Sequence, residues 1–147
     1  MVTPMEIALF EARAAAARGE VPVGAVVLDP NGNILARSGN EVEANHDASA
    51  HAEILALRMA AAAIGDTRLV GCDLIVTLEP CPMCAHAISL FRIRRLIFGA
   101  YDPKGGGVEH GARLFDAPSC HHRPEVIGGV RETEAGDLLR AFFAALR

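Results

Sequence analysis

Two short segments of the chain hold side chains that bind metal ions. His51-Ala52-Glu53 supplies an imidazole and a carboxylate, and Pro80-Cys81-Pro82-Met83-Cys84 supplies two thiols. One His and two Cys leave the fourth position of a zinc ion open, which is typical of catalytic rather than structural sites. Glu53 stands where a general acid/base is needed beside a metal-activated water. The two segments predict a zinc hydrolase with one zinc per chain, ligands His51, Cys81 and Cys84, and Glu53 as catalytic residue.

Each segment is expected to open a helix, one over about residues 50–64 and one over 81–91. Cys81 and Cys84 are three residues apart and therefore share one face of a helical turn. The partial positive charge at a helix N-terminus favours the thiolates that zinc requires. Glu53 lies on a different side of the turn from His51. Two facing helix N-termini are therefore predicted to hold the metal between them, with Glu53 toward the metal-activated water.

Alternating helical and strand patterns surround these two helices. A capping box at Thr3, with Pro4 next, predicts a first helix to about residue 18. Apolar runs at 23–28 and 34–37 flank the turn at 29–32 and predict a hairpin. Further strands are expected at 73–78, 95–100 and 125–130, and a final amphipathic helix at 133–146, burying Leu138, Leu139, Phe142 and Leu146. This order predicts one α/β domain over 1–147, with helices on both faces of a central sheet.

The composition restricts the class of protein. A chain of 147 residues with 51% hydrophobic and 22% charged residues suits one globular domain. Its N-terminus lacks the pattern of a signal peptide, and no apolar run approaches the ~20 residues that span a bilayer. Four cysteines without a secretion signal favour a metal or redox site over a disulfide scaffold. We therefore expect a cytoplasmic protein with no membrane partner.

Charge is unevenly distributed along the chain, whose net charge is −4. Residues 1–50 are acidic, whereas residues 92–123 carry a positive sum from six cations and three acids. The cations of that half are Arg92, Arg94, Arg95, Lys104, Arg113 and Arg123. They form either a phosphate-binding face or ordinary solvated surface.

Other interpretations of the reactive residues remain open. A CxxC pair alone also fits a redox protein, which leaves His51 and Glu53 unexplained, or a zinc-stabilised binding module without turnover. His46 either reaches the substrate or is a solvated loop residue. The run Cys120-His121-His122 suggests a second metal but lacks a fourth ligand of suitable spacing. Cys72 is expected to be a small buried residue.

The chain resembles the cytidine/nucleoside deaminase superfamily, whose known signature is HxE followed by PCxxC. Within it, the sequence is more similar to the bacterial tRNA adenosine deaminases. The matching stretches are 20–25 (EVPVGA), 50–54 (AHAEI), 77–85 (TLEPCPMCA), 92–93 (RI), 98–100 (FGA) and 102–104 (DPK). Two positions depart from the family pattern: His86 replaces a small residue, and Ala48 replaces Pro or Val.

The resemblance implies a cytidine-deaminase-like three-layer α-β-α sandwich with a mixed five-stranded sheet. It also implies zinc-dependent hydrolysis of the wobble adenosine of a tRNA anticodon to inosine, with release of ammonia. Glu53 would accept a proton from the attacking water and return protons to the base. The expected partners are tRNA, through its anticodon stem-loop, and a second copy of the chain in a homodimer.

The resemblance also assigns residues to substrate binding. Asn40 matches the position that binds the base, helped by the backbone N–H of Ala52. Asp102 and Lys104 match a loop that lies against the RNA backbone. The alternative is a small-molecule nucleobase or nucleoside deaminase of the same fold, of guanine or cytosine type. The Arg92–Arg95 cluster and the Asp102–Lys104 stretch favour the RNA substrate.

Overall fold

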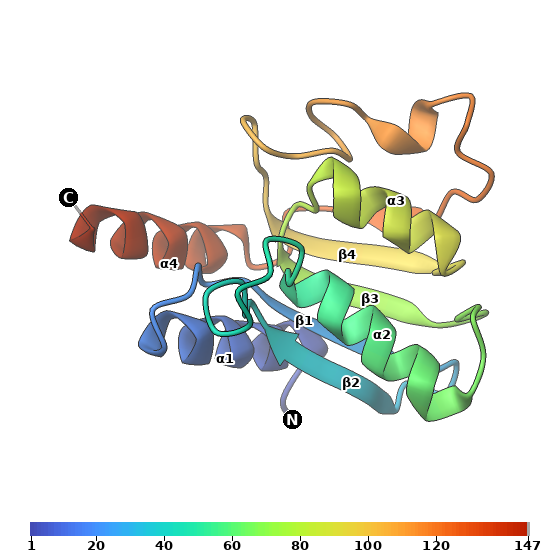
Figure 1. Cartoon of the computed structure of the whole chain (residues 1–147), viewed down its shortest axis with the longest axis horizontal. Coiled ribbons are helices and arrows are strands. Elements are labelled where there is room, and N and C mark those ends of the chain that lie inside the picture. The colour runs from blue at the N-terminus through green and yellow to red at the C-terminus, as the bar shows by residue number, and fades with distance from the viewer. Residues whose placement is uncertain (147) are drawn as a thin grey trace.

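A mixed five-stranded sheet forms the centre of the computed structural model, which describes residues 1–146 (Figure 1). The strands are β1 (Gly24–Leu28), β2 (Ile34–Gly39), β3 (Asp73–Leu78), β4 (Arg95–Ala100) and β5 (Glu125–Ile127). Their order is β2-β1-β3-β4-β5. β1 runs antiparallel to both β2 and β3, while β3, β4 and β5 are parallel. The predicted α/β sandwich with a mixed five-stranded sheet is confirmed.

Helices cover both faces of the sheet. They are α1 (Pro4–Ala17), α2 (Ala52–Ile64), α3 (Pro82–Leu90) and α4 (Glu132–Ala145), with a short 3-10 helix at Leu114–Asp116. Alternate residues of one strand point to opposite faces. Accordingly, Leu74 and Val76 of β3 join the core formed with α2 and α3, whereas Ile75 joins the core formed with α1 and α4. The three inner strands, β1, β3 and β4, are thus largely buried on both faces, which explains their almost continuous apolar sequences.

Local signals fix the ends of several elements as predicted. The Thr3 side chain accepts a hydrogen bond from the Glu6 N–H at 3.2 Å and caps α1. Gly65 ends α2 in the left-handed conformation (φ 70°), which glycine adopts without steric cost. In the hairpin turn, Asp29 Oδ1 accepts the N–H groups of Asn31 and Asn33 at 2.8 and 2.9 Å. The hairpin between β1 and β2 is therefore confirmed.

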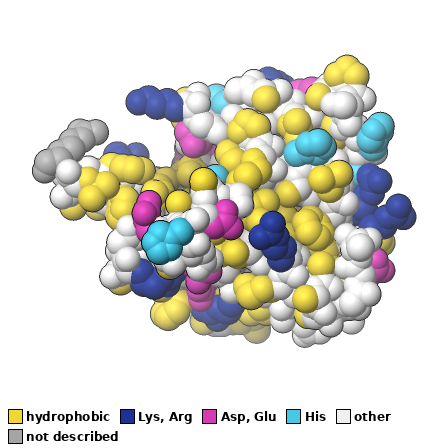
Figure 2. Space-filling model, viewed as in Figure 1, with side chains coloured by type: hydrophobic (Ala, Val, Ile, Leu, Met, Phe, Trp, Pro, Cys, Tyr) yellow, Lys and Arg dark blue, Asp and Glu magenta, His cyan; other side chains and the backbone are white. Residues whose placement is uncertain are grey.

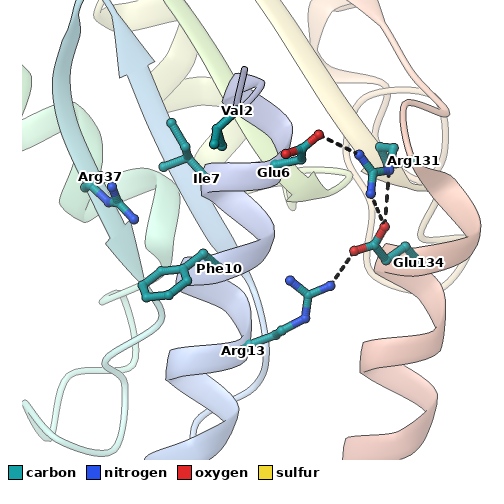
Figure 3. Close-up of a pocket in the computed structure, with 8 residues that line it drawn as sticks. All are labelled: Val2, Glu6, Ile7, Phe10, Arg13, Arg37, Arg131 and Glu134. Atoms are coloured by element: carbon teal, nitrogen blue, oxygen red, sulfur yellow. Dashed lines mark hydrogen bonds and ion pairs between the residues drawn. The ribbon is translucent and has the colours of Figure 1, made fainter.

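The final helix differs from the prediction. Leu138, Leu139 and Phe142 are only half-buried, and Leu146 is 68% exposed. The start of α4 is tied to α1, because Arg131 pairs with Glu6 and Glu134, and Arg13 pairs with Glu134 (Figure 3). Beyond these contacts the helix extends past the edge of the sheet (Figure 1). The helix has the predicted apolar side, but within residues 1–146 other elements pack only against its first turns.

Three strands deliver chain segments to one edge of the sheet. β2, β3 and β4 all run in the same direction, so their C-terminal ends lie together. Asn40 directly follows β2, Cys81 follows β3, and Asp102 follows β4. The crevice at the carboxyl ends of strands is the usual place for a ligand in open α/β sheets. No helix in residues 1–146 is long and apolar enough to cross a membrane.

Candidate metal centre and active-site cavity

His51, Cys81 and Cys84 come together as predicted. His51 is the residue that precedes α2, Cys81 precedes α3, and Cys84 lies in the first turn of α3. His51 Nδ1 lies 3.6 Å from Cys81 Sγ and 3.5 Å from Cys84 Sγ. A tetrahedral zinc with usual bond lengths separates its nitrogen and sulfur ligands by ~3.6 Å. The donor set and its spacing therefore fit zinc, with three protein ligands and one open position.

The helix ends orient these side chains toward one another. Neither His51 nor Cys81 makes a side-chain hydrogen bond that caps its own helix, so both side chains are available to a metal. Within residues 1–146 this is the only cluster of three or more potential ligands. In the Cys120–His122 run, His122 Nε2 instead donates to the Ile93 carbonyl at 2.7 Å, and the Cys120 thiol donates to the His122 carbonyl. A second metal site there is not formed.

The two thiols have different proton affinities. The hydrogen bond from Cys84, and next the one from His51, lowers the pKa of Cys81 to about 4, although burial opposes the shift. The pKa of Cys84 is raised, first by its hydrogen bond to Cys81 and then by burial. The metal-free pair thus shares one proton. Metal binding requires both thiolates and therefore releases it.

Glu53 lies in the first turn of α2 and is only 4% exposed. Burial raises its pKa to about 7, against the opposing effects of its own backbone N–H and of His51. A carboxyl group with a pKa near neutrality can both accept and donate a proton in one reaction cycle. Glu53 lies beside the three potential zinc ligands without being one of them, which is the position required of a general acid/base.

A cavity of about 240 Å³ opens at this site. It is smaller than the sites that enclose drug-sized ligands, which suits a single planar base. Its lining residues are Val21, Val23, Asn40, His51, Ala52, Glu53, Leu78, Glu79, Cys81, Asp102 and Gly105. Val21, Val23, Ala52 and Leu78 thus provide apolar surface, and polar or ionisable side chains converge on the rest of the cavity.

Asn40 presents an unsatisfied hydrogen-bonding group to the cavity. The residue is 7% exposed, and its Oδ1 is the one buried side-chain polar atom in residues 1–146 without a hydrogen-bond partner. Buried polar atoms normally have partners, so an orphan beside a cavity indicates a ligand that supplies one. Ala52 begins α2, where backbone N–H groups have no partner within the helix. Both predicted base-binding groups therefore line the cavity.

The structure separates the remaining predicted residues. Asp102 lines the cavity, whereas Lys104 lies on the same segment but outside the lining. Arg94 makes two hydrogen bonds to Asp73, and Arg95 pairs with Glu125 at 3.0 Å. These arginines lie at the start of β4, about 17 Å from the cavity at ~3.3 Å per strand residue. Neither arginine therefore lies beside this subunit's own cavity, and both are paired with carboxylates.

Sequence reasoning missed two buried carboxylates, one that lines this cavity and one that lines an adjoining groove. Glu79 lines the cavity, and Glu20 accepts the N–H groups of Glu43 and Ala44 at 3.0 and 2.8 Å. Glu20 and Glu79 are 2% and 1% exposed. A charged residue directly after an apolar strand, as Glu79 is after β3, was the available signal, because such residues are rarely buried without partners.

Comparison with known proteins agrees with this geometry. Residues 2–100 match the family model of the cytidine and deoxycytidylate deaminase zinc-binding region. The chain is 58% identical to a tRNA-specific adenosine deaminase of Agrobacterium fabrum, over 97% of this chain and 93% of that protein. Among solved structures, one from work on A-to-I editing by tRNA:A34 deaminases superposes with a TM-score of 0.91 at 56% identity, covering 92% of this chain and 98% of that one.

A more distant structure has the same fold. The guanine deaminase of Nitrosomonas europaea superposes with a TM-score of 0.82 at 27% identity, over 96% of this chain and 83% of that one. Purine deaminases with different substrates therefore share this architecture, and identity favours the tRNA enzymes. The chain binds zinc through the deaminase motif and belongs to the tRNA-specific adenosine deaminases, within the cytidine and deoxycytidylate deaminase family.

Proposed function

We propose that this protein hydrolyses the wobble adenosine of a tRNA anticodon to inosine and ammonia. The observation that supports this most strongly is Glu53, a buried carboxylate that lines the same base-sized cavity as His51 and Cys81 and is not part of the His51-Cys81-Cys84 cluster. Binding modules and redox dithiols have no use for that arrangement. The 147 residues act as one deaminase domain in this proposal.

The chemistry follows from the side chains around the cavity. When bound, zinc acts as a Lewis acid and lowers the pKa of a coordinated water to ~7. Glu53 accepts a proton from the water that attacks C6 of adenine and passes it to the ring nitrogen N1. The carboxyl group then relays the second proton of that water to the amino group, which leaves as ammonia. One water is consumed and one ammonia released for each inosine formed.

The base must leave the anticodon stack to enter the cavity, which costs less in a loop than in a duplex. A second groove of about 450 Å³ adjoins the cavity and shares Val21, Asn40 and His51 with it. Phe142 and Phe143 of the projecting end of α4, and Leu146 directly after it, line this groove. Aromatic rings stack on bases with little regard to sequence. We assign this groove to the nucleotides that flank the extruded adenosine.

Asn40→Ala should lower kcat/KM on an anticodon stem-loop by about 10- to 100-fold, because the base loses a buried hydrogen bond worth ~1–3 kcal/mol. Thermal unfolding should show no loss of stability, since the variant removes an orphan acceptor. Asn45→Ala, which alters an exposed loop residue bonded to Glu41, is the matched control and should change neither quantity. A destabilised Asn40→Ala variant with normal kcat/KM would assign Asn40 to the scaffold instead.

RNA binding should weaken as salt rises, because each phosphate contact releases condensed counterions. Lys104→Ala should reduce the slope of log affinity against log salt by about one contact, ~0.7 for single-stranded RNA. Arg95→Ala serves as the control, since Arg95 is paired at the opposite edge of the sheet. Filter binding over a salt series measures both slopes. Equal slopes for the two variants would remove Lys104 from the RNA contacts.

We further propose that two copies of the chain associate through α2 and α3. Met59 on α2 and Met83 and Leu90 on α3 are exposed by 43%, 39% and 65%. Figure 2 shows hydrophobic side chains spread over this face of the molecule. His86, which departs from the family pattern, is exposed on α3 one turn after Met83. Light scattering of the wild type and of Leu90→Glu tests the dimer, and an unchanged monomer mass for both would refute it.

A cytoplasmic location accompanies this substrate. None of the four cysteines forms a disulfide, which suits a reducing compartment.

The proposed function is tested by measuring ammonia release in parallel on a wobble-adenosine stem-loop and on free guanine, adenine, cytosine and cytidine. The proposal predicts turnover of the stem-loop alone. Turnover of a free base with the RNA unaltered would retain the zinc chemistry and replace the tRNA assignment with the small-molecule alternative.

A further inference from the structure

The segment 102–110 closes one side of the cavity through Asp102 and Gly105, yet it contains neither helix nor strand. Backbone N–H groups that have no ladder or helix partners must find other acceptors when they are removed from water. In this segment four of the eight backbone N–H groups converge on a single side chain, Glu79, which directly follows the neighbouring strand.

Glu79 accepts five hydrogen bonds from the segment. Its Oε1 receives the Asp102 N–H at 3.0 Å and His110 Nδ1 at 2.9 Å. Its Oε2 receives the N–H groups of Val108, Glu109 and His110 at 3.2, 2.9 and 3.0 Å. The side chain itself is fully buried. These donors occupy the acceptor sites of the carboxylate, so Glu79 has no free oxygen to offer a substrate.

The glycines of the segment match this arrangement. A Cβ on Gly106 would lie 2.4 Å from Glu79 Oε2 and 2.5 Å from the Asp102 carbonyl oxygen. A Cβ on Gly107 would lie 2.6 Å from the backbone nitrogen of Pro82, at the start of the helix that holds Cys84. The segment therefore lies directly on Glu79 and on the metal-binding helix, and any side chain at these two positions would push it away.

We infer that Glu79 is a positioning residue that fixes the 102–110 segment as a rigid side of the cavity. Glu79 acts through the segment, because its hydrogen bonds hold Asp102 and Lys104 in one arrangement before RNA binds. RNA binding therefore does not have to lose the conformational entropy of ordering the segment. This inference rests on the proposed function for its substrate, while the contacts that support it are independent of the substrate.

Glu79→Gln retains the shape of the side chain but replaces one acceptor oxygen with an NH₂ donor that faces the N–H groups of the segment. We expect the amides of Val108, Glu109 and His110 to exchange with solvent at least ~10-fold faster, while those of β3 and α2 keep their protection. KM for the stem-loop should rise ~10-fold or more with kcat within a few-fold of wild type. Zinc content should stay at one per chain.

Asp73→Asn is the matched control, because Asp73 is a buried carboxylate at the far end of the same strand, bonded to Arg94. It should lower the melting temperature without changing KM. Gly106→Ala should reproduce the exchange and KM effects with Glu79 present, and it keeps the test valid if Glu79→Gln does not fold. Glu79→Asp, which retains both oxygens, should restore part of the lost affinity.

The inference is overturned if Glu79→Gln and Gly106→Ala raise KM no more than Asp73→Asn does, or if amide exchange at 108–110 is unchanged. Failure of the proposed function is recognised separately. In that case the wild-type protein does not turn over the stem-loop at all, and the exchange measurement still decides whether Glu79 holds the segment.

Discussion

Glu53→Gln is expected to lower kcat on the anticodon stem-loop by ~10²–10⁴-fold, the usual contribution of a general acid/base, while zinc stays at one per chain. The amide has nearly the volume of the carboxyl group but cannot shuttle protons. Because Glu53 is buried and its pKa is raised to about 7, its neutral replacement should leave thermal stability equal or improved. Turnover and zinc content, measured on the same preparation, check the prediction.

Glu132→Gln is a suitable control, since Glu132 is an exposed residue at the start of α4, away from the cavity. It should retain full activity and full zinc. Two results for Glu53→Gln would contradict the account. Loss of zinc in this variant would show that Glu53 is a metal ligand. Normal turnover would show that Glu53 does not carry the proton.

Removal of the metal is expected to abolish turnover and to lower the melting temperature, with both restored on adding zinc back. A ligand present at 1,000 times its dissociation constant stabilises the folded state by ~4 kcal/mol. For a chain of this size that corresponds to roughly 10 °C. Calorimetry and ammonia release, before and after chelation, measure the two effects.

Cysteine variants test which thiols bind the zinc on which activity and stability depend. Cys84→Ala should lose zinc and activity together, because two remaining ligands hold zinc poorly. Cys120→Ser is the matched control, as the Cys120 thiol only donates to the His122 carbonyl and lies near the Ser89 hydroxyl. It should keep one zinc per chain. Activity in fully metal-free protein would exclude the mechanism proposed here.

The metal centre was predictable from the sequence because its determinants are local. His51 and the two cysteines each sit at the start of a helix, and helix starts are set by neighbouring residues such as Pro80 and Pro82. The mixed five-stranded sheet followed from the family resemblance. The strand order and the face covered by each helix were not predicted, because contacts between segments distant in sequence decide them. The amphipathic pattern of α4 identified its apolar side, but such a pattern does not determine how far that side is buried by other elements.

The residues proposed to contact RNA were less predictable, because position along the sequence does not reveal position in space. Arg94, Arg95 and Lys104 are close in sequence, yet β4 separates the first two from the third by the length of a strand. Glu79 is the opposite case, because residues distant from it in sequence are close to it in space. Its partners are 23 to 31 residues away, and only the fold brings them to one carboxylate.

The most direct test of the central claim is the position of inosine in an intact tRNA that carries a wobble adenosine, read by reverse transcription after incubation with the zinc-loaded protein. The account predicts conversion of that adenosine in the wild type, no conversion elsewhere in the anticodon loop, and none with Glu53→Gln. Conversion of several loop adenosines to similar extents, or equal conversion by Glu53→Gln, would contradict it.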